Sequence, residues 1–383
     1  MKTYKSFRLP DLGITIEASI FAPSDKNSEM HAMLHVEPRG EQFPKQLERI
    51  YEGLEALKSQ ETARNMSPVF MRYFLTDATN QAMFIRKEEQ CAVSIIQQPP
   101  LDGSKVALWI YFIEGVEVKN ESCPSPGIAD VIGSTTTAEF GGHKHLWNMG
   151  MCIGEGDSAY QTEKLLTAYE ETLAHYGANI ADDCQRTWFF VRDVDTNYKG
   201  LVVARRDNFT EQGLTSDTHY IASTGIGGSP AETKALVQMG CYAVLGLKKE
   251  QIKYLYAPTH LNPTYEYGVT FERGTRLDLN DRSHVYISGT ASINNKGEVV
   301  HVGDIEKQAE RMCENVKTLL NEAGTEEQDV MQVIVYLRDI ADYDIARKVV
   351  ESHYPDCPIV YTLAPVCRPQ WLIEMECIAA KSL

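Results

Sequence analysis

The stretch VIVYLRDIADY, Val333–Tyr343, joins an apolar, β-branched strand to an Asp and to the start of a helix. The same order of strand and Asp occurs twice more, in RYFLTDATN at Arg72–Asn80 and in WFFVRDVDTN at Trp188–Asn197. A unit of this size cannot bury both faces of its own sheet, so the copies are expected to pack against one another. The sequence therefore predicts three related units, and it places any ligand site in the seams between them.

Further elements surround each of the three strands in the same order. A long helix is expected before each strand, at Pro44–Ser59, Ala159–Tyr176 and Ile305–Ala323. A second helix is expected after each Asp, at Gln81–Gln90, Tyr198–Glu211 and Asp344–His353. A closing strand then begins at Val106, Lys234 and Gln370. The third long helix has the clearest ends, because Asp304 stands at its N-cap position and Gly324 just past its end.

This order of elements predicts an α+β protein of three fused repeats that form a pseudo-trimer, with mixed, mainly antiparallel sheets inside and helices outside. We expect a first unit at residues 1–142, a second at residues 143–247, and a third at residues 248–383 that carries the site. The first unit opens with a strand-like stretch, Tyr4–Phe21. It ends in a linker, Lys119–Gly142, whose CPSPG and GSTTTAEFGG segments are typical of a loop.

The composition is that of an ordinary globular protein with an acidic surface. The 383 residues are 43% hydrophobic and 23% charged, and 53 acidic against 37 basic side chains give a formal charge of −16. Such a surface repels phosphate backbones, and no run of Lys or Arg exceeds two residues, so nucleic-acid binding is not expected. The longest apolar runs are of strand length, so no membrane-spanning helix is expected either.

The cysteine and histidine patterns bear on compartment and cofactors. The nine cysteines show no C-x-x-C pair, and Met1–Lys26 holds no apolar signal segment, which together predict reduced thiols in the cytoplasm. The ten histidines show no ligand spacing beyond HKH at His143–His145, which is typical of a loop. We therefore expect no metal site.

The third closing strand, LIEMECIA, differs from the other two by carrying two acids. Alignment of the closing strands places Glu374 opposite Gln238 and Trp109, and Glu376 opposite Gly240 and Tyr111. The two acids point to one face because side chains alternate along a strand, and burying them is costly unless they are paired. A salt bridge to Arg368 or a wet edge strand would explain them. A ligand site would also explain them, since Cys367, Arg368 and an acid meet in this copy alone.

The third copy contains three long motifs, HVYISGTASINNKGEVVHVGDIEKQAERMCENVKTLLNEAG from His284, VIVYLRDIADYDIAR from Val333 and LIEMECIAA from Leu372. In these motifs the chain resembles the RidA/YjgF family of small trimeric proteins, which share their fold with trimeric chorismate mutase. The resemblance implies an imine deaminase in which an Arg holds the substrate carboxylate and a strand Glu positions water. Arg368 and Glu374 match these roles, although the RidA family separates the two by a longer loop.

Four shorter segments carry a second resemblance: ASTGIGG at Ala222–Gly228, FERG at Phe271–Gly274, SGTAS at Ser288–Ser292 and CRPQWLIEME at Cys367–Glu376. They resemble segments of the chorismatases, which are similar to a RidA trimer fused into one chain. The resemblance implies an enzyme that releases pyruvate from chorismate without metal or organic cofactor, with Glu374 as catalytic acid. The substrate-binding residues that it implies are Arg368, Cys367, Gly274, Thr224, Gly225 and Gly227. A chain that supplies its own neighbours is expected to be a monomer.

The chemistry of chorismate suits these residues. Chorismate is a dianion, and Arg368 can hold one carboxylate through two hydrogen bonds. The glycine-rich STGIGG segment can aim N–H groups at the other carboxylate, unless it is an ordinary tight turn. Cleavage needs a proton on the methylene carbon of the enolpyruvyl ether, which a carboxylic acid delivers best when apolar surroundings raise its pKa. Glu374, flanked by Ile373 and Met375, suits this role, whereas Glu376 is interpreted as structural.

Three questions stay open at this level. Arg205 and Arg206, on the second helix of copy two, either lie on a solvated face or face the seam. The resemblance places Gly274 and Cys367 with chorismatases that form 3-hydroxybenzoate, in which a glycine leaves room for the ring to turn. The alternatives to a chorismatase are a RidA-type imine or enamine deaminase, and a non-catalytic protein that binds a carboxylate ligand in the seam.

Overall fold

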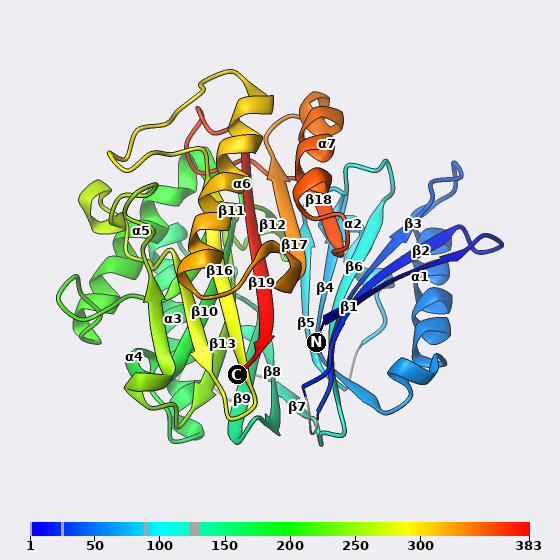
Figure 1. Cartoon of the computed structure of the whole chain (residues 1–383), viewed down its shortest axis with the longest axis horizontal. Helices are drawn as coiled ribbons and strands as arrows, with labels where there is room; N and C mark the ends of the chain where they lie inside the picture. The colour runs from blue at the N-terminus through cyan, green and yellow to red at the C-terminus, as the bar shows by residue number, and fades with distance from the viewer. Residues whose placement is uncertain (1, 24–26, 88–89, 123–129) are drawn as a thin grey trace.

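Three sheets lie side by side in the molecule, and helices cover their outer faces (Figure 1). The computed structural model describes residues 2–23, 27–87, 90–122 and 130–383. Each repeat contributes six strands to a sheet in the same spatial order, with one parallel pair and otherwise antiparallel neighbours. The predicted α+β pseudo-trimer with mainly antiparallel sheets is thus confirmed.

The first sheet has the strand order β1-β2-β3-β6-β4-β5-β12. Its strands are β1 Lys2–Leu9, β2 Ile14–Phe21, β3 Glu29–Val36, β4 Met66–Leu75, β5 Ala92–Gln97, β6 Val106–Glu114 and, from the second repeat, β12 Ser229–Pro230. The amphipathic helix α1, Phe43–Lys58, buries Leu47, Ile50 and Leu54 against this sheet. Strand β12 belongs to the second repeat but pairs with β5 of the first, and so links the two repeats.

The helix expected at Gln81–Gln90 is wrong. Helix α2 spans only Ala78–Gln81, and the short 3-10 turn η2, Ala82–Phe84, follows it. Met83 and Phe84 are exposed, so this stretch has no apolar stripe that could hold a longer helix on the sheet. Two residues of the expected helix, 88–89, lie outside the described residues.

The second sheet has the order β11-β10-β13-β9-β8-β7. Its strands are β7 Lys119–Ser122, β8 Ile132–Phe140, β9 His143–Cys152, β10 Cys184–Val191, β11 Ala222–Gly227 and β13 Val237–Leu245. Its helices are α3 Ser158–His175, α4 Ile180–Asp183 and α5 Val194–Glu211. The long helices α3 and α5 pack on each other and on the outer face of the sheet.

The loop expected at Lys119–Gly142 is wrong over β7 and β8, which form the leading hairpin of the second sheet. The Thr-rich composition was typical of a loop, yet Thr135, Thr136 and Thr137 are buried, and threonine is β-branched and suits a strand. The CPSPG segment lies outside the described residues.

The third sheet has the order β14-β15-β16-β19-β17-β18. Its strands are β14 Ile252–Leu255, β15 Gly274–Asp278, β16 Arg282–Ala291, β17 Val330–Leu337, β18 Ile359–Leu363 and β19 Ile373–Ser382. Helix α6, Ile305–Glu322, packs on β16 and β19, and helix α7, Tyr343–His353, packs on α6. The side chain of Asp304 caps α6 by accepting a hydrogen bond from the Lys307 N–H, as its position predicted.

The inner faces of the sheets meet in one core that contains residues of all three repeats. Aromatic rings bridge them: the centroid of Trp147 lies 6.0 Å from that of Tyr111, and Tyr242 lies 5.1 Å from Tyr286. Because the core is shared, each repeat depends on its neighbours for burial of its apolar face.

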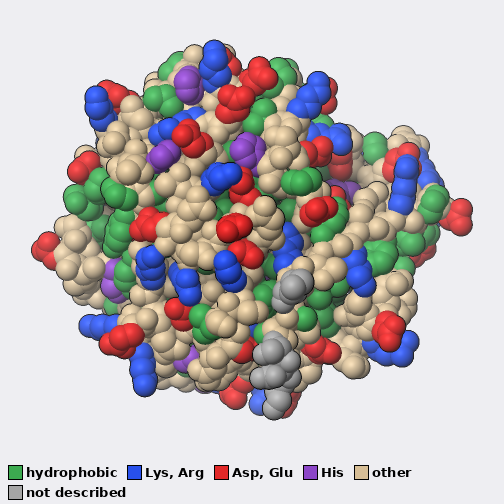
Figure 2. Space-filling model, in the orientation of Figure 1, with side chains coloured by type: hydrophobic (Ala, Val, Ile, Leu, Met, Phe, Trp, Pro, Cys, Tyr) green, Lys and Arg blue, Asp and Glu red, His purple; other side chains and the backbone are tan. Residues whose placement is uncertain are grey.

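The surface carries charges of both signs. Figure 2 shows acidic and basic side chains interspersed over the face of Figure 1, without a large patch of one sign. In the described part of the chain, no helix is both long enough and apolar enough to cross a membrane.

Candidate active site

A cavity of about 410 Å³ lies in the seam between the second and third repeats. Its walls come from α5, β11, the segment before β15, β16 and the loop before β19. The side chains that give it its chemistry are Glu374, Arg205, Arg273, Arg368, Tyr198 and Trp371. This is the seam that the sequence singled out.

Hydrogen bonds between β11, the edge strand of the second sheet, and β16, an inner strand of the third sheet, hold the seam together. The Ser223 N–H of β11 donates to the Ser288 hydroxyl of β16 at 2.9 Å, and the Gly289 N–H donates to the Thr224 hydroxyl at 2.9 Å. The site is therefore built on strands of both repeats, which fix its side chains more firmly than loops would.

Glu374 lies at the floor of this cavity on β19, with 5% of its surface exposed. Burial, and then the nearby charge of Glu376, raise its pKa to about 8, against the opposing effect of Arg186 and Arg273. Glu374 is thus mainly a neutral carboxylic acid at pH 7. Gly289 makes room for it, because a Cβ atom there would lie 2.3 Å from the Glu374 Oε1 atom.

Glu376, two residues further along the same face, is an ion-paired carboxylate. Its Oε2 atom lies 2.8 Å from Arg186 Nη2, and its Oε1 atom accepts a 2.8 Å hydrogen bond from Trp188 Nε1. Arg72 Nη1 is 3.8 Å away. The structural role expected for Glu376 agrees with these contacts, but its partner is Arg186 from the second repeat rather than Arg368.

Positive charge surrounds the acid. Arg205 is buried, with Nη1 3.3 Å from the Ser223 hydroxyl, and Arg273 is buried, donating to the backbone and side-chain oxygens of Asn262. The guanidinium of Arg368 stacks over Trp371 at 4.9 Å. Cations in a partly enclosed cavity attract anions strongly, because the surrounding dielectric is low. The site therefore suits a ligand with more than one negative charge, although the chain as a whole is acidic.

Comparisons with known proteins match this architecture. The family described as Endoribonuclease L-PSP matches residues 278–381. A RutC family protein of Pyrococcus abyssi is 36% identical over 100 residues, which cover 25% of this chain and 78% of that protein. The chain belongs to the Endoribonuclease L-PSP family. The family match lies in the third repeat, the one that carries Glu374.

Two further similarities extend beyond that repeat. The 3-hydroxybenzoate synthase of Streptomyces hygroscopicus is 28% identical over 214 residues, which cover 50% of this chain and 62% of that protein. A crystal structure of chorismatase superposes with a TM-score of 0.63 at 19% identity, and the superposition covers 82% of this chain and 93% of that one. This L-PSP family member therefore has the three-repeat fold of a chorismatase.

Four of the residues implied by the resemblance line the cavity, namely Glu374, Arg368, Cys367 and Gly225. Burial raises the pKa of the Cys367 thiol to about 12, and the charge of Glu374 adds to the effect, so the thiol stays protonated. At Gly225 a Cβ atom would lie 2.9 Å from the ring of Tyr198, so glycine lets this ring reach the cavity.

Three others do not line the cavity. The Thr224 hydroxyl lies below its floor, where it accepts hydrogen bonds from Arg186 and from the Gly289 N–H. Gly227 packs against Pro365, and a Cβ atom at Gly274 would meet the Tyr286 backbone oxygen at 2.9 Å. The space that Gly274 was expected to provide for a ligand ring is therefore absent at this position.

Several lining residues were missed or left open from the sequence. The FERG segment lines the cavity through Arg273, whereas Gly274 was the residue predicted from it. The SGTAS segment lines the cavity through Gly289, although no single residue was predicted from that segment. Arg205 faces the seam, whereas Arg206 is half-exposed at the rim and pairs with Asp207. Tyr198 and Trp371 gave no distinguishing signal, because apolar aromatic residues are common in any core.

The register of the three closing strands identifies the residues that correspond to Glu374 in the other two repeats. Three residues before each repeat's Asp, the strand residues Phe74, Phe190 and Tyr336 pair with Ala107, Gln238 and Glu374. The predicted alignment is therefore correct for Gln238 and wrong by two residues for Trp109. A shift of two leaves every side chain on the same face, so the apolar pattern could not detect it.

The equivalent positions in the other seams lack an acid. Gln238 donates a 2.9 Å hydrogen bond to the Ser94 hydroxyl of the first repeat. At the seam between the first and third repeats the equivalent residue is Ala107. The acids near that seam, Glu17 and Asp102, lie at other positions, 3.5 and 3.6 Å from His35. Of the three equivalent residues, Ala107, Gln238 and Glu374, Glu374 is thus the acid.

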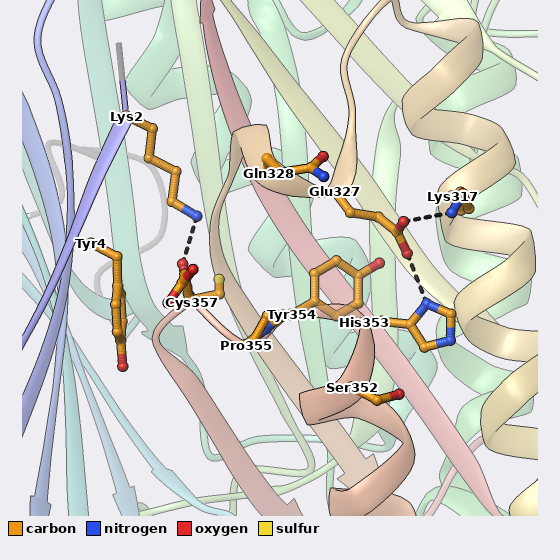
Figure 3. Close-up of a pocket in the computed structure, with 11 residues that line it drawn as sticks. Lys2, Tyr4, Lys317, Glu327, Gln328, Ser352, His353, Tyr354, Pro355 and Cys357 are labelled. Carbon is orange, nitrogen blue, oxygen red and sulfur yellow. Dashed lines mark hydrogen bonds and ion pairs between the residues drawn. The ribbon is translucent and has the colours of Figure 1, made fainter.

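A larger cavity, about 670 Å³, lies between β1 and the third repeat (Figure 3). Its Glu327 pairs with Lys317 and His353 at 2.7 and 2.8 Å; burial raises its pKa, but these hydrogen bonds outweigh burial and lower it. A serine becomes a nucleophile when a histidine accepts its hydroxyl proton. The Ser352 hydroxyl instead donates to the Val349 carbonyl of its own helix, and not to His353. Glu327 is therefore an ionised carboxylate, unlike the carboxylic acid of Glu374.

Metal ligands do not cluster in the part of the chain that the structure describes. No group of three or more His, Cys, Asp or Glu side chains there could hold a metal ion.

Proposed function

We propose that this protein is a chorismatase-like enzyme that cleaves the enolpyruvyl ether of chorismate and releases pyruvate and 3-hydroxybenzoate. One observation carries the proposal: a carboxylic acid with a pKa raised to about 8 lies at the floor of an arginine-lined cavity. The chorismatase fold and the similarity to a 3-hydroxybenzoate synthase support it independently.

Glu374 is the general acid of this reaction. It transfers its proton to the methylene carbon of the enolpyruvyl group, which becomes a methyl group, and the adjacent carbon takes on positive charge. The resulting Glu374 carboxylate stabilises that charge in a cavity of low dielectric. Breaking the bond between the ring carbon and the ether oxygen then gives the carbonyl group of pyruvate. As the ether oxygen leaves, the oxygen of the neighbouring ring hydroxyl bonds to the same ring carbon and closes an epoxide, and the hydroxyl proton restores the acid on Glu374. The epoxide then opens at the carbon that originally held the hydroxyl, and the ring becomes aromatic with its hydroxyl at the 3-position. No water is consumed overall.

The arginines bind the two carboxylates of the substrate. Arg205, Arg273 and Arg368 approach the cavity from three different elements, so they can hold two separated carboxylates at once. The seam holds these arginines in fixed positions. The bound substrate therefore keeps its methylene carbon over Glu374 before the proton moves. Three arginines in place of one explain how a protein with a charge of −16 attracts a dianion.

The product assignment rests on fewer residues. Cys367 lines the cavity with a protonated thiol, a weak polar group that can face the ring. Gly274 does not contribute space, so the proposal relies on Cys367 and on the 3-hydroxybenzoate synthase similarity. Chromatography of the products distinguishes 3-hydroxybenzoate from a non-aromatic diol, and the diol as sole product would contradict this part of the proposal.

A deaminase is the second candidate, because the 3-aminoacrylate deaminase RutC of Acinetobacter baylyi is 34% identical over 97 residues, covering 25% of this chain and 77% of that protein. A Glu that positions water acts best as an ionised acceptor, and the raised pKa of Glu374 favours the proton-donor role instead. Assays of pyruvate from chorismate and of ammonia from 3-aminoacrylate separate the two. Binding of chorismate without turnover would indicate a non-catalytic pocket.

A further inference from the structure

The deepest contacts of the site come from all three repeats. Glu376 of the third repeat binds Arg186 and Trp188 of the second, and Arg72 of the first lies 3.8 Å away. All four side chains are buried. The guanidinium of Arg72 lies 5.1 Å from the ring centroid of Trp188. The closed ring of repeats is thus what brings these charges under Glu374.

Arg186 is held at a fixed place beneath the floor. Its Nη2 atom contacts both the Glu376 carboxylate and the Thr224 hydroxyl. The Thr224 hydroxyl also accepts the Gly289 N–H, and Gly289 lies directly against the carboxyl of Glu374. Glu374 and Glu376 share one strand face two residues apart, roughly 7 Å along the strand. The Arg186 guanidinium and the Glu374 carboxyl already act on each other electrostatically, so a guanidinium released by Glu376 would have Glu374 as an alternative carboxylate partner.

We propose that Glu376 is a positioning residue that retains Arg186 below the Thr224 hydroxyl and thereby keeps Glu374 uncharged and able to donate its proton. This inference rests on the proposed function for its catalytic meaning, but the charge state it describes exists without substrate. Its physical basis is competition: a buried guanidinium pairs with an available carboxylate, and an ionised Glu374 would be that carboxylate if Glu376 were neutral.

Titratable groups from every neighbouring element bear on Glu374. They are Glu376 on β19, Arg186 on β10, Arg273 before β15, Tyr336 on β17, Cys367 and Arg368 in the loop before β19, and Arg205 on α5. Tyr336 and Cys367 stay neutral, because burial raises the pKa of each well above neutrality. Among these groups, Arg186 and Arg273 act most strongly against the effect of burial on Glu374, and Glu376 is the single negative charge.

The test is an infrared titration of the protonated-carboxyl band that is lost in Glu374→Gln. In the wild-type protein this band should persist at pH 7. In Glu376→Gln it should titrate at a pH lower by about one unit or more, because Glu374 now faces an uncompensated guanidinium. The pH above which chorismate turnover declines should fall by the same amount, while turnover at low pH is retained. An unchanged titration in folded Glu376→Gln would overturn the inference.

A charge-neutral double variant covers the case in which Glu376→Gln does not fold. Glu376→Gln with Arg186→Gln removes both charges of the pair, a change that buried ion pairs often tolerate. The band should then titrate closer to the wild-type pH than it does in Glu376→Gln alone, and a value as low as in the single variant would contradict the inference. A band that behaves as expected in a protein without chorismate turnover would reject the proposed function and leave this inference standing.

Discussion

Glu374 of the third repeat and Gln238 of the second occupy the same register position, each paired with the aromatic residue three places before the repeat's Asp. The two side chains differ only in the terminal group, yet they end in different surroundings. Gln238 closes its seam with a hydrogen bond to Ser94, whereas Glu374 borders a cavity. The same register position thus borders an open cavity in the third repeat and a closed, hydrogen-bonded seam in the second.

The raised pKa of Glu374 should cost the fold stability as the pH rises. In the unfolded chain this acid ionises near 4.5, whereas the folded form keeps its proton until about pH 8. The unfolded state therefore binds fewer protons between these values, and stability falls with rising pH in that window. Glu374→Gln should be more stable than wild type by up to about 3 kcal/mol at pH 7 and by little at pH 4.5. Denaturant unfolding at the two pH values measures this, and equal differences would contradict it.

The pH dependence of turnover should follow the same group. In the proposed mechanism protonated Glu374 is the active form, so kcat/KM for chorismate should be level below pH 7 and decline tenfold per pH unit above about 8. A rate that instead rises through pH 8 would mean that the ionised carboxylate is the active form, as a water-positioning role requires.

Neighbouring arginines provide a matched pair for substrate binding. Arg205 is buried against the cavity, while Arg206 is half-exposed and paired with Asp207. Arg205→Met should weaken chorismate binding by about 1.5–3 kcal/mol, or roughly 10- to 150-fold in Kd. Arg206→Met should change Kd by less than about fivefold, because exposed ion pairs contribute little. Equal effects in calorimetric titrations of chorismate, measured in the inactive Glu374→Gln background, would show that only overall charge matters.

Gly289 tests the space beside the acid. A methyl group at this position would lie 2.3 Å from Glu374 Oε1 and 3.2 Å from Thr224, so Gly289→Ala should push the carboxyl out of place. We expect kcat to fall by at least roughly tenfold with circular dichroism unchanged, since a misplaced catalytic group loses alignment in the transition state. Wild-type turnover in a folded Gly289→Ala protein would show that the carboxyl is free to move.

Much of the fold could be predicted from the sequence because one pattern recurs three times. The strand, the Asp and the flanking helices are predictable in every copy except for the second helix of the first copy, where Met83 and Phe84 are exposed. Strand β8 was missed because threonine is common in loops, although its branched side chain suits a sheet.

The site was predictable only in part, because its charges converge from different repeats. Glu374 is unusual within its own strand and could be recognised there. Arg186 is a single Arg in an aromatic strand, and nothing local shows that its carboxylate partner is Glu376, 190 positions away. Arg205, next to Arg206, has the pattern of a solvated helix face, and only the packing of α5 over the seam distinguishes the two.

The most direct test of the central claim is release of pyruvate from chorismate by the wild-type protein and by Glu374→Gln. Glu327→Gln, which alters an ionised acid in the other cavity, is the control. We expect wild type and the control to release pyruvate, and Glu374→Gln to be slower by about 10² to 10⁴-fold with little change in Kd, because the lost proton is needed only in the transition state. Undiminished pyruvate release by folded Glu374→Gln would contradict the account.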